Sequence, residues 1–276
     1  MDKSQGQILL RENDKIINEF KKLTSVEYLQ KYGILLALFL MCAILSIISP
    51  HFLKIGNIIN ILLQSSINAI LAFGLTFVII TSGIDLSVGS ILALGGVTMG
   101  IVLQNLSNVF FAILLGLLVS SLCGLTNGLL ITRLDLPPFI VTLGMMSIAR
   151  GFALIITKGY PISGLPPMVR FLGAGKILGI PVPVIIGGGI YIITHIILSQ
   201  TKLGRYAYAI GGNEEATKLS GVDVNKYKII IYTISGIFAG ISGIVLAVFC
   251  KRKFPIFAKI FPQAPVGNFY VNLIAS

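Results

Sequence analysis

An acidic residue stands within an apolar region of the chain, where a charge is costly and therefore informative. The motif Gly83-Ile-Asp-Leu-Ser-Val-Gly-Ser90 joins two short apolar stretches, Ile67–Ile80 and Val88–Leu103. Transporters expose half-helix ends to substrate at such glycine-interrupted segments, and an acid near membrane depth is a functional candidate. We expect Asp85 and Ser87 either to lie on a translocation pathway or to cap the helix that follows, because both side chains accept hydrogen bonds from helical N–H groups.

A second polar group lies about forty residues further along the chain. Asn127 falls within an apolar segment, and Arg133 and Asp135 follow the end of that segment. We count Asn127 with the residues of a pathway or structural break, and we interpret Arg133 and Asp135 as interfacial charges. Pro137 and Pro138 cannot continue a helix but suit the first turn of the next one.

The third group is a polar island between two long apolar segments. It reads Leu203-Gly-Arg-Tyr-Ala-Tyr-Ala-Ile-Gly-Gly-Asn-Glu-Glu-Ala-Thr-Lys-Leu-Ser-Gly-Val-Asp223. Helix connections in bundles usually take about 2 to 8 residues, so this island is longer than a simple turn requires. Its length and mixed charge favour a docking loop, with an ordinary cytosolic loop as the alternative.

Nucleotide and metal chemistry find little support in the chain. The stretch Gly173-Ala-Gly-Lys-Ile177 contains the Gly-Lys pair of a phosphate-binding loop, but Arg170 stands where that loop needs glycine, and Ile177 where it needs Ser or Thr. Active transport would therefore require an ATPase in another chain. His51 and His195 are isolated, and the three cysteines have no pairing or ligand spacing. We predict no catalytic residue, cofactor or metal site.

Composition places the chain in a bilayer, because 55% of its residues are hydrophobic, 11% are charged and the mean hydropathy is +0.94. A helix needs about 20 apolar residues to cross roughly 30 Å of hydrocarbon. The predicted fold is all-α, a polytopic transmembrane helix bundle with about seven apolar segments and one broken-helix region. The segments are Gly33–Ser49, Ile58–Ser82, Val88–Leu103, Val109–Ile131, Phe139–Thr157, Pro181–Ser199 and Ile229–Phe249. The pairs Gly96/Gly100 and Gly236/Gly240 permit close helix packing.

The predicted organisation has three parts. Residues 1–32 form a cytoplasmic N-terminal tail, either an amphipathic surface helix or a solvated segment. Residues 33–249 form the transmembrane domain, with the polar island inside a loop at about 201–226. Residues 250–276 form a basic tail.

Lysine and arginine positions predict the orientation, because cytoplasmic loops are enriched in them. With the N-terminus inside, strict alternation places twelve Lys and Arg residues on the cytoplasmic side, in residues 1–31, at Arg133 and in residues 201–228. The opposite side receives Lys54, Lys158, Arg170 and Lys176. This bias accounts for the net charge of +11 without a nucleic acid partner.

Three motifs in this order resemble one family. They are Gly-Ile-Asp-Leu-Ser-Val-Gly-Ser at 83–90, Leu-Pro-Pro-Phe-Ile-Val-Thr-Leu-Gly at 136–144 and Leu-Gly-Arg-Tyr-Ala-Tyr-Ala-Ile-Gly-Gly-Asn-Glu-Glu-Ala at 203–216. The chain resembles the ribose/xylose/arabinose-type permeases of bacterial ABC importers from about residue 33 to Val248.

The resemblance implies a multi-pass permease of the bacterial plasma (inner) membrane, usually a homodimer, that translocates a monosaccharide, with a ribose-like pentose favoured. It also implies a cytoplasmic ABC ATPase and a periplasmic or lipid-tethered sugar-binding protein as partners. The segment at 203–223 would dock the ATPase. The positions carried over for this coupling are Gly204, Arg205, Gly211, Gly212, Asn213 and Glu214, with the two adjacent glycines shaping a turn and the charged pair facing the ATPase.

The chain departs from the family pattern near Cys250, where relatives continue into further spans. Here the sequence reads Cys250-Lys-Arg-Lys-Phe-Pro and ends at Ser276, which suggests a truncation or frameshift after about Val248. The alternatives to a working importer are a nonfunctional truncated permease, a secondary transporter that uses no ATPase, and an intramembrane enzyme. A secondary transporter favours intramembrane ion-coupling acids, and Asp85 is the one candidate in this sequence.

Overall fold

A computed structural model describes residues 26–106, 108–160, 162, 169, 171, 173 and 175–253. The surface helix expected in the N-terminal tail lies largely outside these residues. So does most of the basic tail at 250–276, so the expected truncation stays a prediction. The described chain is helical at 26–32, which extends the first helix into the predicted tail, and at 251–253.

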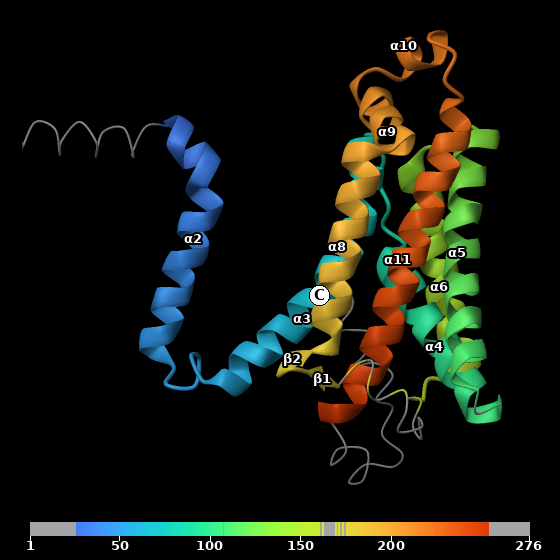
Figure 1. Ribbon diagram of the computed structural model, residues 1–276. Helices are drawn as coiled ribbons and strands as arrows, with labels where there is room; N and C mark the ends of the chain where they lie inside the picture. Colours follow the sequence, from blue (N-terminus) through green and yellow to red (C-terminus); the bar gives the residue numbers. More distant parts are fainter. Residues whose placement is uncertain are drawn as a thin grey trace, which may run out of the picture. The chain divides into compact units, whose positions relative to one another are not determined.

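The all-α prediction is confirmed, with one short hairpin added (Figure 1). All seven predicted apolar segments coincide with helices to within a few residues. The elements are α2 (Val26–Ile48), α3 (Ile55–Ile80), α4 (Val88–Leu106), α5 (Val109–Arg133), α6 (Pro138–Thr157), β1 (Lys176–Ile177), β2 (Ile180–Pro181), α8 (Val182–Gln200), α9 (Lys202–Gly212), α10 (Glu214–Leu219) and α11 (Val224–Lys253).

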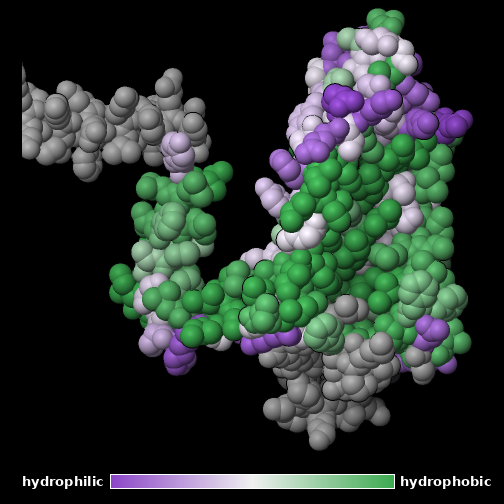
Figure 2. All heavy atoms as spheres, in the orientation of Figure 1, coloured by the Kyte–Doolittle hydropathy of each residue, from purple (hydrophilic) through white to green (hydrophobic). Residues whose placement is uncertain are grey.

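Six of the described helices are long and apolar enough to cross a membrane, namely α3, α4, α5, α6, α8 and α11. The apolar part of α2 is shorter, at Tyr32–Ile48. Figure 2 shows the second unit clad in hydrophobic side chains along its helices, with hydrophilic residues gathered at the end that carries α9 and α10. This distribution is the one expected for a bundle whose flanks face lipid.

The chain divides into two compact units, Met1–Asn60 and Ile61–Ser276. In the first unit, α2 exposes most of its large apolar side chains, including Ile34, Phe39 and Ile47. In the second unit, α11 packs most extensively against α5 and α4. Because α2 exposes so much apolar surface, it needs lipid or another helix as its surroundings.

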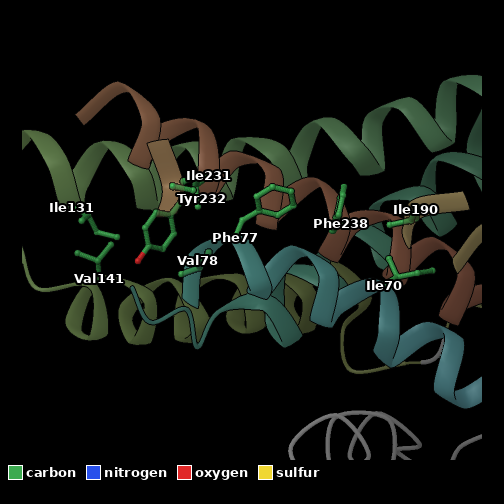
Figure 3. Packing of buried hydrophobic residues seen from close by; sticks show 10 residues of the cluster. Ile70, Phe77, Val78, Ile131, Val141, Ile190, Ile231, Tyr232 and Phe238 are labelled. Atoms are coloured by element: carbon green, nitrogen blue, oxygen red, sulfur yellow. The ribbon is translucent and has the colours of Figure 1, made fainter. Parts of the chain in front are cut away.

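The core of the second unit gathers around α11. Phe77 of α3 and Phe238 of α11 meet edge to face, with ring centroids 6.3 Å apart. Figure 3 shows both rings together with Tyr232 between α3 and α11. Ile131 of α5 and Val141 of α6 belong to the same cluster. With Ile190 of α8 and Ala207 of α9, the cluster joins six helices, from α3 to α11.

Glycines allow the closest helix contacts, as the sequence predicted. A Cβ atom added to Gly236 of α11 would lie 2.5 Å from the Ser120 carbonyl oxygen of α5. One added to Gly96 of α4 would lie 2.7 Å from the Gly243 carbonyl oxygen of α11. Gly240 meets the Ser120 side chain in the same way, whereas Gly100 faces the side chain of Ile162. Backbone groups of α4, α5 and α11 thus approach one another directly.

The turn before α6 also follows its prediction. Pro137 occupies the N-cap position and Pro138 begins the helix. Proline is tolerated there because the first helical N–H groups have no partner within the helix. The chain can therefore reverse sharply after α5 ends at Arg133.

The contact at Gly236 gives a stability prediction. Gly236→Ala should destabilise the protein by about 1–3 kcal/mol, because the new methyl group meets a backbone carbonyl that cannot rotate away. The matched control is Gly188→Ala in α8, where an added Cβ meets nothing within 4 Å. Thermal unfolding of both purified variants in detergent measures the difference. Equal melting temperatures for the two variants would contradict the proposed packing.

Candidate functional site

The connection between α3 and α4 is non-helical and enters the bundle. Figure 1 shows it as a coil that leads to the start of α4, and its residues Ile84 and Asp85 bond to α11. Along it, Ile84 and Leu86 are exposed, whereas Asp85 and Ser87 are buried. This alternation is that of an extended segment, in which successive side chains point to opposite sides. Asp85 and Ser87 therefore face the interior together.

One expectation about this connection was wrong. The stretch before it is not a short half-helix at Ile67–Ile80, because α3 begins at Ile55 and has 26 residues. The polar residues in its first half do not end the helix. Ser66, for example, donates its hydroxyl to the carbonyl of Leu63 at 2.8 Å, so it bonds to its own helix. The non-helical segment thus separates two full spans.

The structure brings Asp85, Ser87 and Asn127 into one hydrogen-bonded cluster. Asp85 Oδ1 accepts from the Ser87 backbone N–H at 2.9 Å and from Ser87 Oγ at 2.6 Å. Asn127 Nδ2 of α5 donates to Ser87 Oγ at 2.9 Å. Ser235 Oγ of α11 donates to Asp85 Oδ2 at 3.0 Å. The cluster therefore joins three separate parts of the bundle, and all four residues are buried.

The need of backbone N–H and C=O groups for hydrogen-bond partners explains why a carboxylate stands here. Irregular backbone at membrane depth leaves polar groups without helical partners, and it is tolerated only where protein or water supplies them. Asp85 supplies an acceptor for the N–H of Ser87, and the Tyr232 hydroxyl donates to the Ile84 carbonyl at 3.3 Å. Ser87 takes the N-cap position of α4, because its carbonyl accepts the N–H of Ile91.

Among the described residues, the side-chain amide of Asn127 donates a hydrogen bond through Nδ2 but accepts none through Oδ1. Its side chain is fully buried, yet Oδ1 has no hydrogen-bond partner among the described residues. Asn127 lies six residues before Arg133, so it stands about 9 Å from the end of α5. The cluster thus keeps one free acceptor below the surface of the bundle, where it can receive a hydroxyl or a water molecule.

Three residues of this site were missed from the sequence, namely Lys228, Tyr232 and Ser235. Their spacing of i, i+4 and i+7 places them on one face of α11. Polar residues that recur at this spacing within an apolar segment were the available signal. Their partners could not be read in the same way, because Asp85 and Ser235 are 150 residues apart.

The polar island folds as two short helices, α9 and α10. Gly204 is buried, and an added Cβ there would meet the Leu198 carbonyl of α8. Gly211 lies against the Ile80 carbonyl of α3 in the same manner, whereas a Cβ added to Gly212 would meet nothing within 4 Å. The turn between the helices falls at Asn213, which is extended (φ −158°, ψ 106°) and accepts the N–H of Ala216 at 2.9 Å. The turn is thus made one residue after the two glycines.

Two contacts hold α9 and α10 against α11. Glu214 pairs with Lys228, with Nζ 2.6 Å from Oε2. The rings of Tyr206 and Tyr227 meet edge to face at 4.7 Å between centroids. The ion pair is partly exposed, so its strength is limited by solvent screening. Arg205, by contrast, is exposed on α9.

The polar island and the Asp85 cluster are therefore adjacent. Gly211 contacts the end of α3, and Ser82 Oγ donates to the Gly211 carbonyl at 3.4 Å. On the other side, α11 carries both Lys228, which holds α10, and Ser235, which holds Asp85. A displacement of α9 and α10 would reach residues 81–87 along both routes.

Removal of the Asp85 carboxylate tests its structural role. Asp85→Leu should cost several kcal/mol, because the buried N–H of Ser87 would lose its acceptor. Ser235→Ala should cost only about 1 kcal/mol, since it removes one hydrogen bond to a retained carboxylate. Unfolding of both variants in detergent micelles measures the order. Wild-type stability in Asp85→Leu would contradict this account of the cluster.

Comparison with known proteins identifies the family to which the chain belongs. A family model described as the permease component of branched-chain amino acid transport systems matches residues 57–262. The ribose import permease of Escherichia coli K12 is 42% identical over 222 residues, which cover 79% of this chain and 69% of that protein. That of Bacillus subtilis 168 is 42% identical over 236 residues, covering 84% and 73%.

The name of a further relative specifies a different sugar. The D-allose transport system permease of Escherichia coli K12 is 38% identical over 231 residues, covering 83% of this chain and 71% of that protein. No solved structure matches the chain. The comparisons confirm the resemblance inferred from the three motifs. The chain belongs to the permease-component family of branched-chain amino acid transport systems, and it is a multi-pass transport subunit of the inner membrane.

Proposed function

We propose that the chain is the permease subunit of an ATP-binding-cassette importer that moves a monosaccharide, with a ribose-like pentose favoured, into the cytoplasm. The observation that carries this proposal is 42% identity to the ribose import permeases of two distant bacteria over most of the chain. ATP hydrolysis belongs to a separate cytoplasmic ATPase. A periplasmic or lipid-tethered binding protein delivers the sugar, and two copies of the permease form the channel.

The proposed orientation puts α9 and α10 in the cytoplasm, together with the N-terminus. It is supported by the fold, because α5 ends at Arg133 on the side of the bundle where α9 and α10 lie (Figure 1). The hydrophilic residues in Figure 2 gather at that same end. The lysines and arginines of both segments then fall on the cytoplasmic side, as the charge bias of membrane proteins requires.

In this proposal the helices α9 and α10 receive the ATPase. Arg205 is available for that contact, because it is exposed on α9. Glu214 faces Lys228 and is used mainly to hold α10 on α11. Gly204 and Gly211 allow α9 to pack closely against α8 and α3. Asn213 caps α10. A Cβ added to Gly212 would meet nothing within 4 Å. Such seating transmits rigid-body motion better than a flexible loop does.

The Asp85 cluster is proposed to be the structural break that receives this motion. Its carboxylate already accepts three hydrogen bonds from Ser87 and Ser235, which suits a positional role. The free Oδ1 of Asn127 is the group that suits contact with a passing hydroxyl. Asp85 and Ser87 thus hold α4 against α11, and Asn127 supplies the remaining polar surface of the pathway.

Uptake measurements test the proposed transport. Cells that lack their own ribose permease, but contain its ATPase and binding protein, should accumulate labelled ribose when they express this chain. Labelled xylose and galactose, measured in parallel, define the sugar preference. An ATPase variant that binds but does not hydrolyse ATP should abolish the uptake. Accumulation that persists with this ATPase variant would indicate a secondary transporter instead.

The seating of α9 gives a second prediction. Gly211→Ala should lower ATP-dependent uptake at least tenfold without preventing membrane insertion, because the new methyl group would push α9 away from the Ile80 carbonyl. Gly189→Ala is the matched control, since an added Cβ there meets nothing within 4 Å. Uptake is compared at equal amounts of protein in the membrane. Normal uptake by Gly211→Ala would show that this contact is not needed for coupling.

A further inference from the structure

The short hairpin before α8 has an unusual tip. Its strands pair Lys176 with Pro181 and Ile177 with Ile180. The two residues of the loop are Leu178 (φ 50°) and Gly179 (φ 84°), so both are left-handed. Two-residue loops of this kind normally carry Asn, Asp or Gly at the first position, because a leucine side chain disfavours the left-handed region. Leu178 is therefore held against its backbone preference.

Exposure is a second disadvantage for the same side chain. Leu178 is 98% exposed, and its neighbours Ile177 and Ile180 are 44% and 49% exposed. In water an asparagine at position 178 would relieve both the backbone strain and the exposure of apolar surface. A leucine disfavoured on both counts indicates that the tip does not face water.

The location of the hairpin identifies what it faces. Strand β2 continues directly into α8 at Val182, at the end of the bundle opposite to α9 and α10 (Figure 1). The 19 residues of α8 extend about 28 Å, slightly less than the roughly 30 Å of a hydrocarbon core. The hairpin thus begins at the membrane boundary. It continues the exposed apolar surface of α8, which comprises Ile185, Tyr191, Ile192, Ile193 and Ile196.

We propose that the hairpin Lys176–Pro181 is a membrane-interface anchor. Leu178 inserts between the lipid headgroups and the acyl chains, with Ile177 and Ile180 beside it, and Lys176 lies close enough to reach lipid phosphates. The anchor fixes the depth of the N-terminal end of α8. It requires neither a particular sugar nor a particular direction of transport, so it stands apart from the proposed function.

Spin-label accessibility in a bilayer tests the anchor. The full chain, with its three cysteines replaced, is reconstituted in vesicles of phosphatidylethanolamine and phosphatidylglycerol, and a nitroxide is attached at Leu178→Cys. Leu219→Cys in α10 is the matched site, because Leu219 is also a highly exposed leucine (89%) at the hydrophilic end. We expect several-fold greater relaxation by oxygen than by a water-soluble nickel chelate at 178, and the reverse at 219. Nickel access at 178, or protection from both reagents by a protein contact, would overturn the proposal.

A second pair of variants excludes insertion caused by the label itself. The nitroxide is moved to Ile180→Cys, and position 178 is varied. Leu178→Asn suits the left-handed loop and should preserve the hairpin, but it removes the apolar tip. The label at 180 should then become several-fold more accessible to nickel, whereas Leu178→Met should leave it unchanged. Equal accessibility in the asparagine and methionine variants would show that Leu178 does not anchor the hairpin.

Discussion

The structure depends on one constraint, that backbone polar groups at membrane depth must find partners within the protein. Helices meet it by themselves, which is why nearly all of the described chain between 26 and 253 is helical. The segment between α3 and α4 cannot. Two of its groups, the N–H of Ser87 and the carbonyl of Ile84, bond to the Asp85 carboxylate and the Tyr232 hydroxyl. A charged side chain in an apolar bundle is the consequence of an interrupted helix.

The hydrogen bonds to this segment also connect several helices of the bundle. The side chains that bond to Asp85 and Ser87 from outside the segment come from α5 and α11, which meet through close glycine contacts. The same α11 holds α10 through Lys228 and Glu214. Helices α9 and α10 are thus held to the bundle by the Gly204 and Gly211 contacts and by a partly exposed ion pair. Their contacts reach α3, α11 and the segment between α3 and α4.

The sequence predicted the helices well, because a run of about 20 apolar residues has few other stable forms. It also identified Asp85, Ser87 and Asn127 as unusual, since each is a polar residue in or beside an apolar segment. It did not reveal that they touch one another, because hydropathy carries no information on which helix faces meet. Gly211 illustrates the same limit: the sequence suggested a turn, whereas its role is a tertiary contact with Ile80.

Within the cluster, the carboxylate and the amide have different capacities. Asp85 accepts bonds from a backbone N–H and two hydroxyls, so a ligand that used it would have to displace existing donors. Among the residues that the structure describes, Asn127 Oδ1 has no hydrogen-bond donor to displace. Because Asn127 is held through Ser87, any shift of α4 relative to α5 would reposition this acceptor. The group open to a new partner is thus also the one whose position depends on the interrupted segment.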